Sequence, residues 1–204
     1  MGRMEQGHLQ HGPLGENCAH LCVDMQNLFV DTDWHTPWMK RVLPVVERIA
    51  RAKPDRTVFT RFIPAERPGE GEGTWRRYWE RWSSMTLESL PPGAADLLPP
   101  LKALVPPAEV IDKRVYSPWV GSDLHERLRA RGVDTLVVSG VETDVCVAGA
   151  VLGAVDLGYR VVVPTDAICS SSDETHDALL TLYRRRYAQQ VETVVSDEIL
   201  RAWG

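Results

Sequence analysis

Short runs of apolar, mostly β-branched residues recur along the chain and alternate with longer segments of helical periodicity. Two of these runs, Leu136-Val137-Val138 and Val161-Val162-Val163, are apolar at every position. Because a strand covered on both faces buries every side chain, such runs are typical of a parallel sheet between layers of helices. We predict six strands, at His20–Val23, Thr57–Arg61, Glu109–Ile111, Thr135–Ser139, Arg160–Val163 and Glu192–Val195.

The segments between these strands carry helical patterns with recognisable ends. Pro37 suits a first helical turn, Gly132 and Gly158 suit the position after a last turn, and Ser171 with Glu174 resembles a capping box. Strand and helix alternate, which predicts a single doubly wound α/β domain with a mainly parallel sheet and helices on both faces. The predicted helices are Pro37–Ala52, Ser122–Arg131, Asp144–Leu157, Asp173–Tyr187 and Ser196–Ala202.

Two segments do not follow this alternation. Residues 1–17 are polar and contain glycines, which predicts a flexible N-terminal arm before a domain at residues 18–204. The excursion Ile63–Pro107 carries three Pro-Pro pairs, and it places Trp75, Trp79 and Trp82 at helical spacing. This stripe favours packing against the body of the domain or a partner subunit, and a lid over a substrate pocket is the alternative.

Composition narrows the classes of function. A chain of 204 residues fits one domain, and the net charge of -5 without a long basic stripe argues against a nucleic-acid partner. No apolar run approaches the roughly 20 residues that span a bilayer, so we expect no membrane partner. Four cysteines are too few for a disulfide scaffold, which favours reduced thiols and a cytoplasmic location.

Three residues with reactive side chains lie where predicted strands end. Asp24 follows the first strand, Lys113 follows the third, and Cys146 lies near the start of the helix after the fourth. Alone, each has an ordinary interpretation, as a turn cap, an exposed lysine and an inert thiol. Parallel strands bring their carboxyl ends to one edge, where ligands bind, and a helix start favours thiolate. Together they would supply a nucleophile, a proton-transfer group and a charge stabiliser.

Longer stretches around these residues resemble a known family, the isochorismatase-like cysteine hydrolases, which include nicotinamidases and N-carbamoylsarcosine amidase. The resemblance covers nearly the whole chain, from about Ala19 to Val195. It implies Asp24 as the acid and base, Lys113 as its catalytic partner and Cys146 as the nucleophile. The matching stretches are Leu21-Cys-Val-Asp-Met-Gln-Asn27, Asp112-Lys-Arg-Val-Tyr-Ser117, Gly140-Val-Glu-Thr-Asp-Val-Cys-Val147 and Ala150–Ser172.

The resemblance also implies features of the backbone and of the assembly. A non-proline cis peptide is expected at Val141–Glu142, and the amides of Glu142 and Cys146 are expected to form the oxyanion hole. The side chain of Glu142 is larger than the small residue common at this place in the family, so it can matter separately. Family members commonly assemble as a homodimer or homotetramer.

Two departures from related enzymes sharpen the expected chemistry. Isochorismatases of the siderophore type lack the cysteine, so Cys146 argues for amide hydrolysis. Metal-containing nicotinamidases carry an Asp-x-His…His set after the second strand, whereas Phe59–Pro64 contains no imidazole here. His35 follows the first strand and is interpreted as a loop residue. We therefore expect no catalytic metal and no cofactor.

The substrate pocket is less defined by the sequence. Arg61, at the end of the second strand, either pairs with a substrate carboxylate or locks the excursion by a salt bridge, and the structural role is favoured. Phe29, Tyr116 and Trp119 follow the Asp24 and Lys113 motifs and form pocket walls or pack in the core. The predicted function is hydrolysis of a small amide or ureide through a cysteine thioester. The alternatives are hydrolysis of an N-carbamoyl group and a silent binding or scaffold member.

Overall fold

The computed structural model describes residues 8–203 of the chain. Its centre is a parallel sheet with the strand order β3-β2-β1-β4-β5-β7, and a short strand, β6, pairs with the end of β4. The predicted doubly wound α/β fold is therefore confirmed. The sheet has one strand more than predicted, because two residues of β6 are too few to give a sequence pattern. The strands are β1 Cys18–Val23, β2 Thr57–Phe62, β3 Glu109–Lys113, β4 Thr135–Val141, β5 Arg160–Pro164, β6 Ile168–Cys169 and β7 Val191–Val194.

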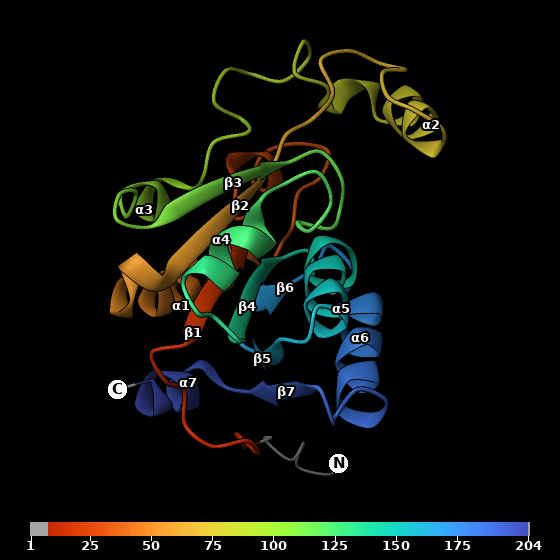
Figure 1. Ribbon diagram of the computed structural model, residues 1–204. Helices are drawn as coiled ribbons and strands as arrows, with labels where there is room; N and C mark the ends of the chain where they lie inside the picture. Colours follow the sequence, from red (N-terminus) through yellow and green to blue (C-terminus); the bar gives the residue numbers. More distant parts are fainter. Residues whose placement is uncertain (1–7, 204) are drawn as a thin grey trace.

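Helices cover both faces of the sheet (Figure 1). Helices α1, α3 and α7 pack on one face, and α4, α5 and α6 pack on the other. No helix within residues 8–203 is long and apolar enough to cross a membrane. The α-helices are α1 Met39–Ala52, α2 Thr74–Arg81, α3 Pro99–Lys102, α4 Leu124–Ala130, α5 Ala148–Asp156, α6 Asp173–Arg185 and α7 Ser196–Ala202; the 3₁₀ turns are Asn27–Phe29, Pro54–Arg56 and Ser83–Met85, and a π-helical turn spans Thr143–Val147.

Strand β1 shows why the central strands are mostly apolar. Cys18 and Cys22 pack with α1, while Ala19, Leu21 and Val23 pack with the helices of the opposite face. Successive side chains of a strand point to opposite faces, so a strand with helices on both sides buries them all. Each fully buried Val or Leu contributes about 1.5–3 kcal/mol of transfer free energy. The uninterrupted apolar runs therefore identify the strands at the centre of the sheet.

Some of the predicted helix ends hold and others are shifted. Gly132 and Gly158 follow α4 and α5 with positive φ angles of 67° and 83°, as glycines after a last helical turn do. The cap of α6 is Ser172 rather than Ser171, and its Oγ accepts the N–H of Thr175 at 3.4 Å. Helix α1 begins at Met39, two residues after Pro37.

The described part of the predicted N-terminal arm is held against the domain. The N–H of Gln10 donates to Glu192 Oε2 at 2.5 Å, and Arg160 donates to the carbonyl of Gly12 at 2.9 Å. Leu14 donates its N–H to the carbonyl of Ala202. Polar composition led to the prediction of a loose arm, but backbone groups of the described part bond charged side chains of β5 and β7 and a carbonyl of α7. Residues 1–7 of the predicted arm lie outside the described residues.

The excursion between β2 and β3 contains α2 and α3, and its part with α2 lies beyond the sheet, at the top of Figure 1. Its Trp79 is 4% exposed and stacks on Phe62 of β2 with ring centroids 5.9 Å apart. The excursion returns beside the end of β1, where Leu98 donates its N–H to the carbonyl of Met25. The side chain of Gln26 also bonds the carbonyls of Phe62 and Ala95. The tryptophan stripe therefore packs partly against the body of the domain.

Candidate active site

The order of the strands brings the three predicted reactive residues together. Asp24 follows β1, Lys113 ends β3 and Cys146 follows β4, so parallel strands deliver all three to one edge of the sheet. Lys113 Nζ lies 2.7 Å from Asp24 Oδ2 and 3.4 Å from Cys146 Sγ. The side chains of Asp24 and Lys113 are fully buried, and Cys146 is 5% exposed. The lysine therefore contacts both the carboxylate and the thiol.

Asp24 is oriented by Thr60, a buried residue of β2 that the sequence analysis missed. The backbone of Asp24 has φ 50°, a left-handed conformation that aspartate tolerates better than most residues. Its N–H donates to the carbonyl of Thr60, and its Oδ1 accepts the Thr60 hydroxyl at 2.5 Å. Oδ2 is left facing Lys113 and accepts no other hydrogen bond from the described residues. One oxygen is thus fixed while the other is available to exchange a proton.

Lys113 is held as a cation although it is buried. Its Nζ donates to the carbonyl of Val115 at 3.1 Å and lies 5.0 Å from the ring centroid of Phe62. Burial lowers the pKa of Lys113, but the neighbouring Asp24 carboxylate and Cys146 together raise it by more. The net pKa therefore lies above its ordinary value. The ammonium therefore stays charged throughout the neutral range.

Cys146 lies in a turn that differs from the predicted helix start. The helix expected from Asp144 begins instead as the π-helical turn Thr143–Val147, followed by α5. The carbonyl of Glu142 accepts the N–H groups of both Val145 and Val147, which wraps the chain around the thiol-bearing residue. π-Helical turns occur frequently at functional sites. The peptide bond between Val141 and Glu142 is cis, at the position that the resemblance implies.

The thiol does not rest as the thiolate that its place at a helix start predicts. Burial raises the pKa of Cys146 well above its ordinary value, the Asp24 carboxylate raises it further, and Lys113 lowers it. The helix start and Lys113 favour thiolate as predicted, but desolvation is the larger effect. The resting group is therefore a neutral thiol beside a carboxylate, and it needs that carboxylate as a base.

The turn that carries Cys146, residues 142–147, is held by the segment between β6 and α6 and by the first turns of α6. Three consecutive residues at its start each form a hydrogen bond to this region. The bonds join Glu142 Oε1 to the N–H of Ser171 (3.0 Å), Thr143 Oγ1 to His176 Nδ1 (2.8 Å) and Asp144 Oδ1 to the Ser170 hydroxyl (2.5 Å).

A cavity of about 200 Å³, which we call the aromatic cavity, opens beside Cys146. Phe29 and Tyr116 line it, which agrees with their interpretation as pocket walls. Trp34, Tyr78 and Trp82 also line it, although the sequence analysis did not name them singly as pocket residues. For Trp82, the alternative interpretation of the tryptophan stripe as a lid over a pocket agrees with this position. The excursion thus supplies pocket walls as well as core packing. The aromatic lining is completed by Phe62, and the other lining residues are Asp33, His35, Glu142, Val145, Cys146 and Ser171.

Two predicted pocket residues lie elsewhere. Trp119 packs on α5, where its Nε1 donates to the carbonyl of Ala150 at 2.9 Å and its ring stacks on Tyr159. Arg61 forms a two-point ion pair with Asp112, at 2.7 and 2.8 Å, and also contacts a carboxylate of the excursion. Arg61 therefore forms a salt bridge to the excursion, as the favoured interpretation predicted. Arg61 is not among the residues that line the aromatic cavity.

The metal-ligating side chains of the described chain do not gather as a metal site requires. No group of three or more His, Cys, Asp or Glu residues within residues 8–203 is arranged to hold an ion. His35 lines the aromatic cavity, and its Nδ1 donates to the carbonyl of Val30 at 2.5 Å. The imidazole is therefore fixed by the loop backbone.

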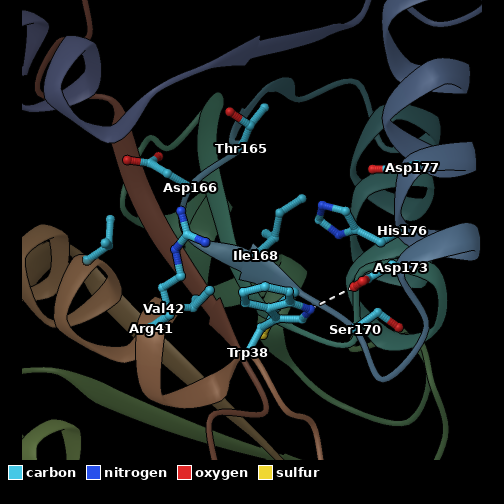
Figure 2. Close-up of a pocket in the computed structure, with 12 residues that line it drawn as sticks. Trp38, Arg41, Val42, Thr165, Asp166, Ile168, Ser170, Asp173, His176 and Asp177 are labelled. Atoms are coloured by element: carbon cyan, nitrogen blue, oxygen red, sulfur yellow. Dashed lines mark hydrogen bonds between the residues drawn. The ribbon is translucent and has the colours of Figure 1, made fainter.

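A second cavity, of about 610 Å³, lies between α1 and α6 (Figure 2). Trp38 and Arg41 enter it from one side, and Asp173 and His176 enter it from the other. Trp38 Nε1 donates to Asp173 Oδ1 at 2.7 Å across the opening. This cavity is the larger of the two, but it does not contain Cys146. The aromatic cavity is therefore the candidate active site.

We expect Cys146 to react first with iodoacetamide among the four thiols, because it is the one that lines the aromatic cavity. Cys18 and Cys22 are fully enclosed in β1, and burial raises the pKa of Cys18 and of Cys169 to about 12. Alkylation needs thiolate, so the rate at Cys146 rises with pH. Peptide mapping after brief labelling at several pH values measures this order.

Removing either of the two charges beside Cys146 is expected to shift the pH profile of its labelling, in opposite directions for the two variants. Asp24→Asn removes a charge that raises the pKa of Cys146, so its labelling profile shifts to lower pH. Lys113→Ala removes a charge that lowers this pKa, so the profile shifts to higher pH. Faster labelling of Cys18 or Cys22 than of Cys146 would contradict the assignment of the reactive thiol.

The comparison with protein families gives the class of the chain. Residues 18–196 match the family model described as the isochorismatase domain. This match covers the sheet, the helices on both faces and all three reactive residues. The protein belongs to the isochorismatase family.

Relatives within the family are similar over much of the chain. A protein of Arabidopsis thaliana named as a probable inactive nicotinamidase is 30% identical over 79% of this chain and 85% of its own length. The N-carbamoylsarcosine amidase of an Arthrobacter species is 27% identical over 80% of this chain and 64% of its own length. Relatives with identities of 35–40% match shorter stretches, and the chain spans only 37–47% of their length.

A solved structure shares the whole fold. The crystal structure of a cysteine hydrolase from Pseudomonas syringae covers 99% of this chain and 98% of its own chain, with a TM-score of 0.80 and 20% identity. At that identity the likeness concerns the fold. Besides the N-carbamoylsarcosine amidase, the relatives include proteins named as a nicotinamidase of Arabidopsis thaliana and a maleamate amidohydrolase of Pseudomonas putida.

Proposed function

We propose that this protein hydrolyses the C–N bond of a small amide or ureide through a thioester on Cys146. The observation that carries the proposal is the contact of one buried ammonium, Lys113, with both the Asp24 carboxylate and the Cys146 thiol. A nucleophile, a base and a fixed charge within hydrogen-bond reach are what covalent acyl transfer needs. The adjoining aromatic cavity supplies the space for a substrate.

In the first step Asp24 takes the proton of the Cys146 thiol, and the sulfur attacks the carbonyl carbon of the substrate. Asp24 suits this role because its Oδ1 is held by Thr60 while its Oδ2 faces the reacting groups. The raised pKa of Cys146 makes such a base necessary. Lys113 keeps the charge balanced as negative charge moves from the carboxylate to the sulfur.

The tetrahedral intermediate carries a negative oxygen that needs hydrogen-bond donors. The backbone N–H groups of Glu142 and Cys146 are proposed to supply them, because both belong to the turn at residues 142–147, beside the cavity. Donors of this kind, fixed before the reaction, are each worth about 3–4 kcal/mol of barrier where measured. The hydrogen bonds from the turn to the segment before α6 would hold these donors in place.

Collapse of the intermediate breaks the C–N bond. Protonated Asp24 returns its proton to the leaving ammonia or amine, and a thioester remains on Cys146. Asp24 then takes a proton from water, which attacks the thioester, releases the acid and restores the thiol. Each proton that Asp24 accepts is given back, so the cycle ends with the enzyme in its starting state.

Ammonia release from a panel of small amides and ureides tests the proposal. We expect hydrolysis by the intact protein, and a loss of at least about a thousandfold in Cys146→Ala. Cys169→Ala is the matched control, because this thiol is also buried but lies outside the aromatic cavity. Equal hydrolysis by the intact protein and by Cys146→Ala, with the fold unchanged, would show that the covalent route is wrong.

Two other functions are tested by the same panel. An N-carbamoyl hydrolase would release ammonia and carbon dioxide from ureides alone, and the similarity to an N-carbamoylsarcosine amidase favours including this class. A silent binding member would release nothing, and one relative is named as probably inactive. The contact of all three reactive side chains supports an active enzyme over the silent one.

A further inference from the structure

The lining of the aromatic cavity has an unusual balance of rings and charges. Five of the rings that line it pack together, and the ring of Trp34 contacts the other four, with centroid distances of 6.1 Å to Phe29, 5.9 Å to Phe62, 6.1 Å to Tyr78 and 5.9 Å to Trp82. The faces of aromatic rings are negative, and several rings around one space attract a cation and its alkyl groups.

The charged groups that line this cavity are carboxylates. Asp33 and Glu142 both line it, and no lysine or arginine does. Neither carboxylate forms an ion pair with another residue of the described chain. Glu142 Oε1 is held by the N–H of Ser171, and Asp33 Oδ2 by the hydroxyl of Ser84, so both acids have fixed positions.

Two positive groups near the cavity are paired with carboxylates. Lys113 is paired with Asp24 at 2.7 Å, and Arg61 is paired with Asp112. Arg81 lies over the ring of Trp82, 4.9 Å from its centroid, but is not a lining residue. A substrate with its own carboxylate would enter beside two lining acids and no lining cation, which like-charge repulsion disfavours. A substrate with an ammonium group would meet both acids and the ring faces.

The size of the cavity limits the rest of the molecule. Its volume of about 200 Å³ is below the range of roughly 300–1,000 Å³ typical of sites for drug-sized ligands. The carbonyl must reach Cys146, and Glu142, which lines the same cavity, is the first residue of the turn that carries Cys146. The charge on the substrate therefore has to lie a few bonds from the amide.

We infer that this site recognises a small amide that carries a positive charge, as a protonated or quaternary amine, a few bonds from the scissile carbonyl. The ring faces around Trp34 and the side chain of Glu142, with Asp33, recognise the cation. This inference rests on the proposed hydrolysis for the fate of the amide, but recognition of the cation can be measured apart from it.

Three acetamides that differ in the charge of one substituent test the inference. Betaine amide carries a trimethylammonium group, 3,3-dimethylbutanamide carries the uncharged tert-butyl group of the same shape, and malonamate carries a carboxylate. We expect kcat/KM to be at least about tenfold higher for betaine amide than for the uncharged isostere, and lowest for malonamate. Uncharged amide hydrolysed as well as betaine amide would overturn the inference.

Binding separates recognition from reactivity, because an ammonium group also activates the neighbouring carbonyl. The dissociation constants of the three compounds for Cys146→Ala can be followed by tryptophan fluorescence, since Trp34 and Trp82 line the cavity. We expect betaine amide to bind at least about tenfold more tightly than its isostere. Equal affinities would contradict the inference even if kcat differed.

Charge-removing variants identify the groups that recognise the cation. Glu142→Gln and Asp33→Asn, each in the Cys146→Ala background, should each lower the ratio of the two affinities at least about threefold. Glu88→Gln is the control, because this exposed carboxylate of the excursion lies outside the aromatic cavity. An unchanged ratio in both cavity variants would overturn the assignment of the site.

The outcomes distinguish this inference from the proposed function. Cysteine-dependent hydrolysis of all three amides at similar rates would support the proposed function and contradict the inference. Selective binding of betaine amide without hydrolysis of any amide in the panel would support cation recognition and contradict the proposed hydrolysis.

Discussion

Loss of either Cys146 or Asp24 is expected to abolish most of the activity, and loss of both is expected to cost little more. Cys146→Ala and Asp24→Ala should each lower kcat by about a thousandfold or more, because an acyl-enzyme route fails when either the nucleophile or its base is absent. Groups that act as one unit are strongly non-additive. Steady-state kinetics of the two single variants and the double variant measures the coupling.

The design of this experiment must separate chemistry from folding. Asp24 and Lys113 form a fully buried ion pair, and removing one partner of such a pair typically destabilises a protein by about 3–5 kcal/mol. Circular dichroism and denaturant unfolding of each variant therefore accompany the kinetics, and Asp24→Asn gives a variant of similar volume. Additive losses in variants that remain folded would mean that the two residues act independently.

A second large effect is expected at Gly140, and it concerns stability. A Cβ atom added at Gly140 would lie 2.0 Å from the carbonyl oxygen of Val23, and the φ angle of 113° is unfavourable for other residues. Strand β1 would have to move away from β4 immediately before Asp24. Gly140→Ala should therefore lower the free energy of unfolding by at least about 4 kcal/mol, in the range of exceptional single changes. Urea unfolding followed by circular dichroism measures it.

Gly132 offers a matched control for this prediction. It also has a positive φ, of 67°, but an added Cβ meets no atom within 4 Å. Gly132→Ala should therefore cost only the backbone strain, about 1–2 kcal/mol. Similar losses of unfolding free energy in the two variants would show that β1 and β4 leave room for a Cβ atom at Gly140.

The positions of the reactive residues could be predicted because they depend on strand order. Asp24, Lys113 and Cys146 each follow a strand recognisable from its apolar run, and parallel strands bring such ends to one edge. The direction of a side chain is harder to predict. Phe62 lines the cavity, whereas its neighbour Arg61 points to Asp112, because successive residues of a strand face opposite sides. A boundary error of one residue reverses this assignment.

The environment of Cys146 shows a second limit of prediction from sequence. The start of a helix is visible in the sequence, and by itself it favours thiolate. Burial is not visible there, because it depends on what the rest of the chain places over the thiol. The walls of the aromatic cavity are hard to predict for a similar reason. Trp34 comes from an irregular loop, and Tyr78 comes from α2, whose position over the sheet depends on the path of the excursion.

The walls of the aromatic cavity and the reactive groups come from different parts of the chain. Cys146, Asp24 and Lys113 belong to the sheet edge, whereas Tyr78 and Trp82 come from an insertion between two strands. Doubling the length of a flexible loop costs only about 0.6 kcal/mol of closure entropy, so such an insertion tolerates change. Replacing the excursion between β2 and β3 would therefore change the walls of the aromatic cavity, and with them the choice of substrate. The positions of Asp24, Lys113 and Cys146 at the sheet edge would stay the same.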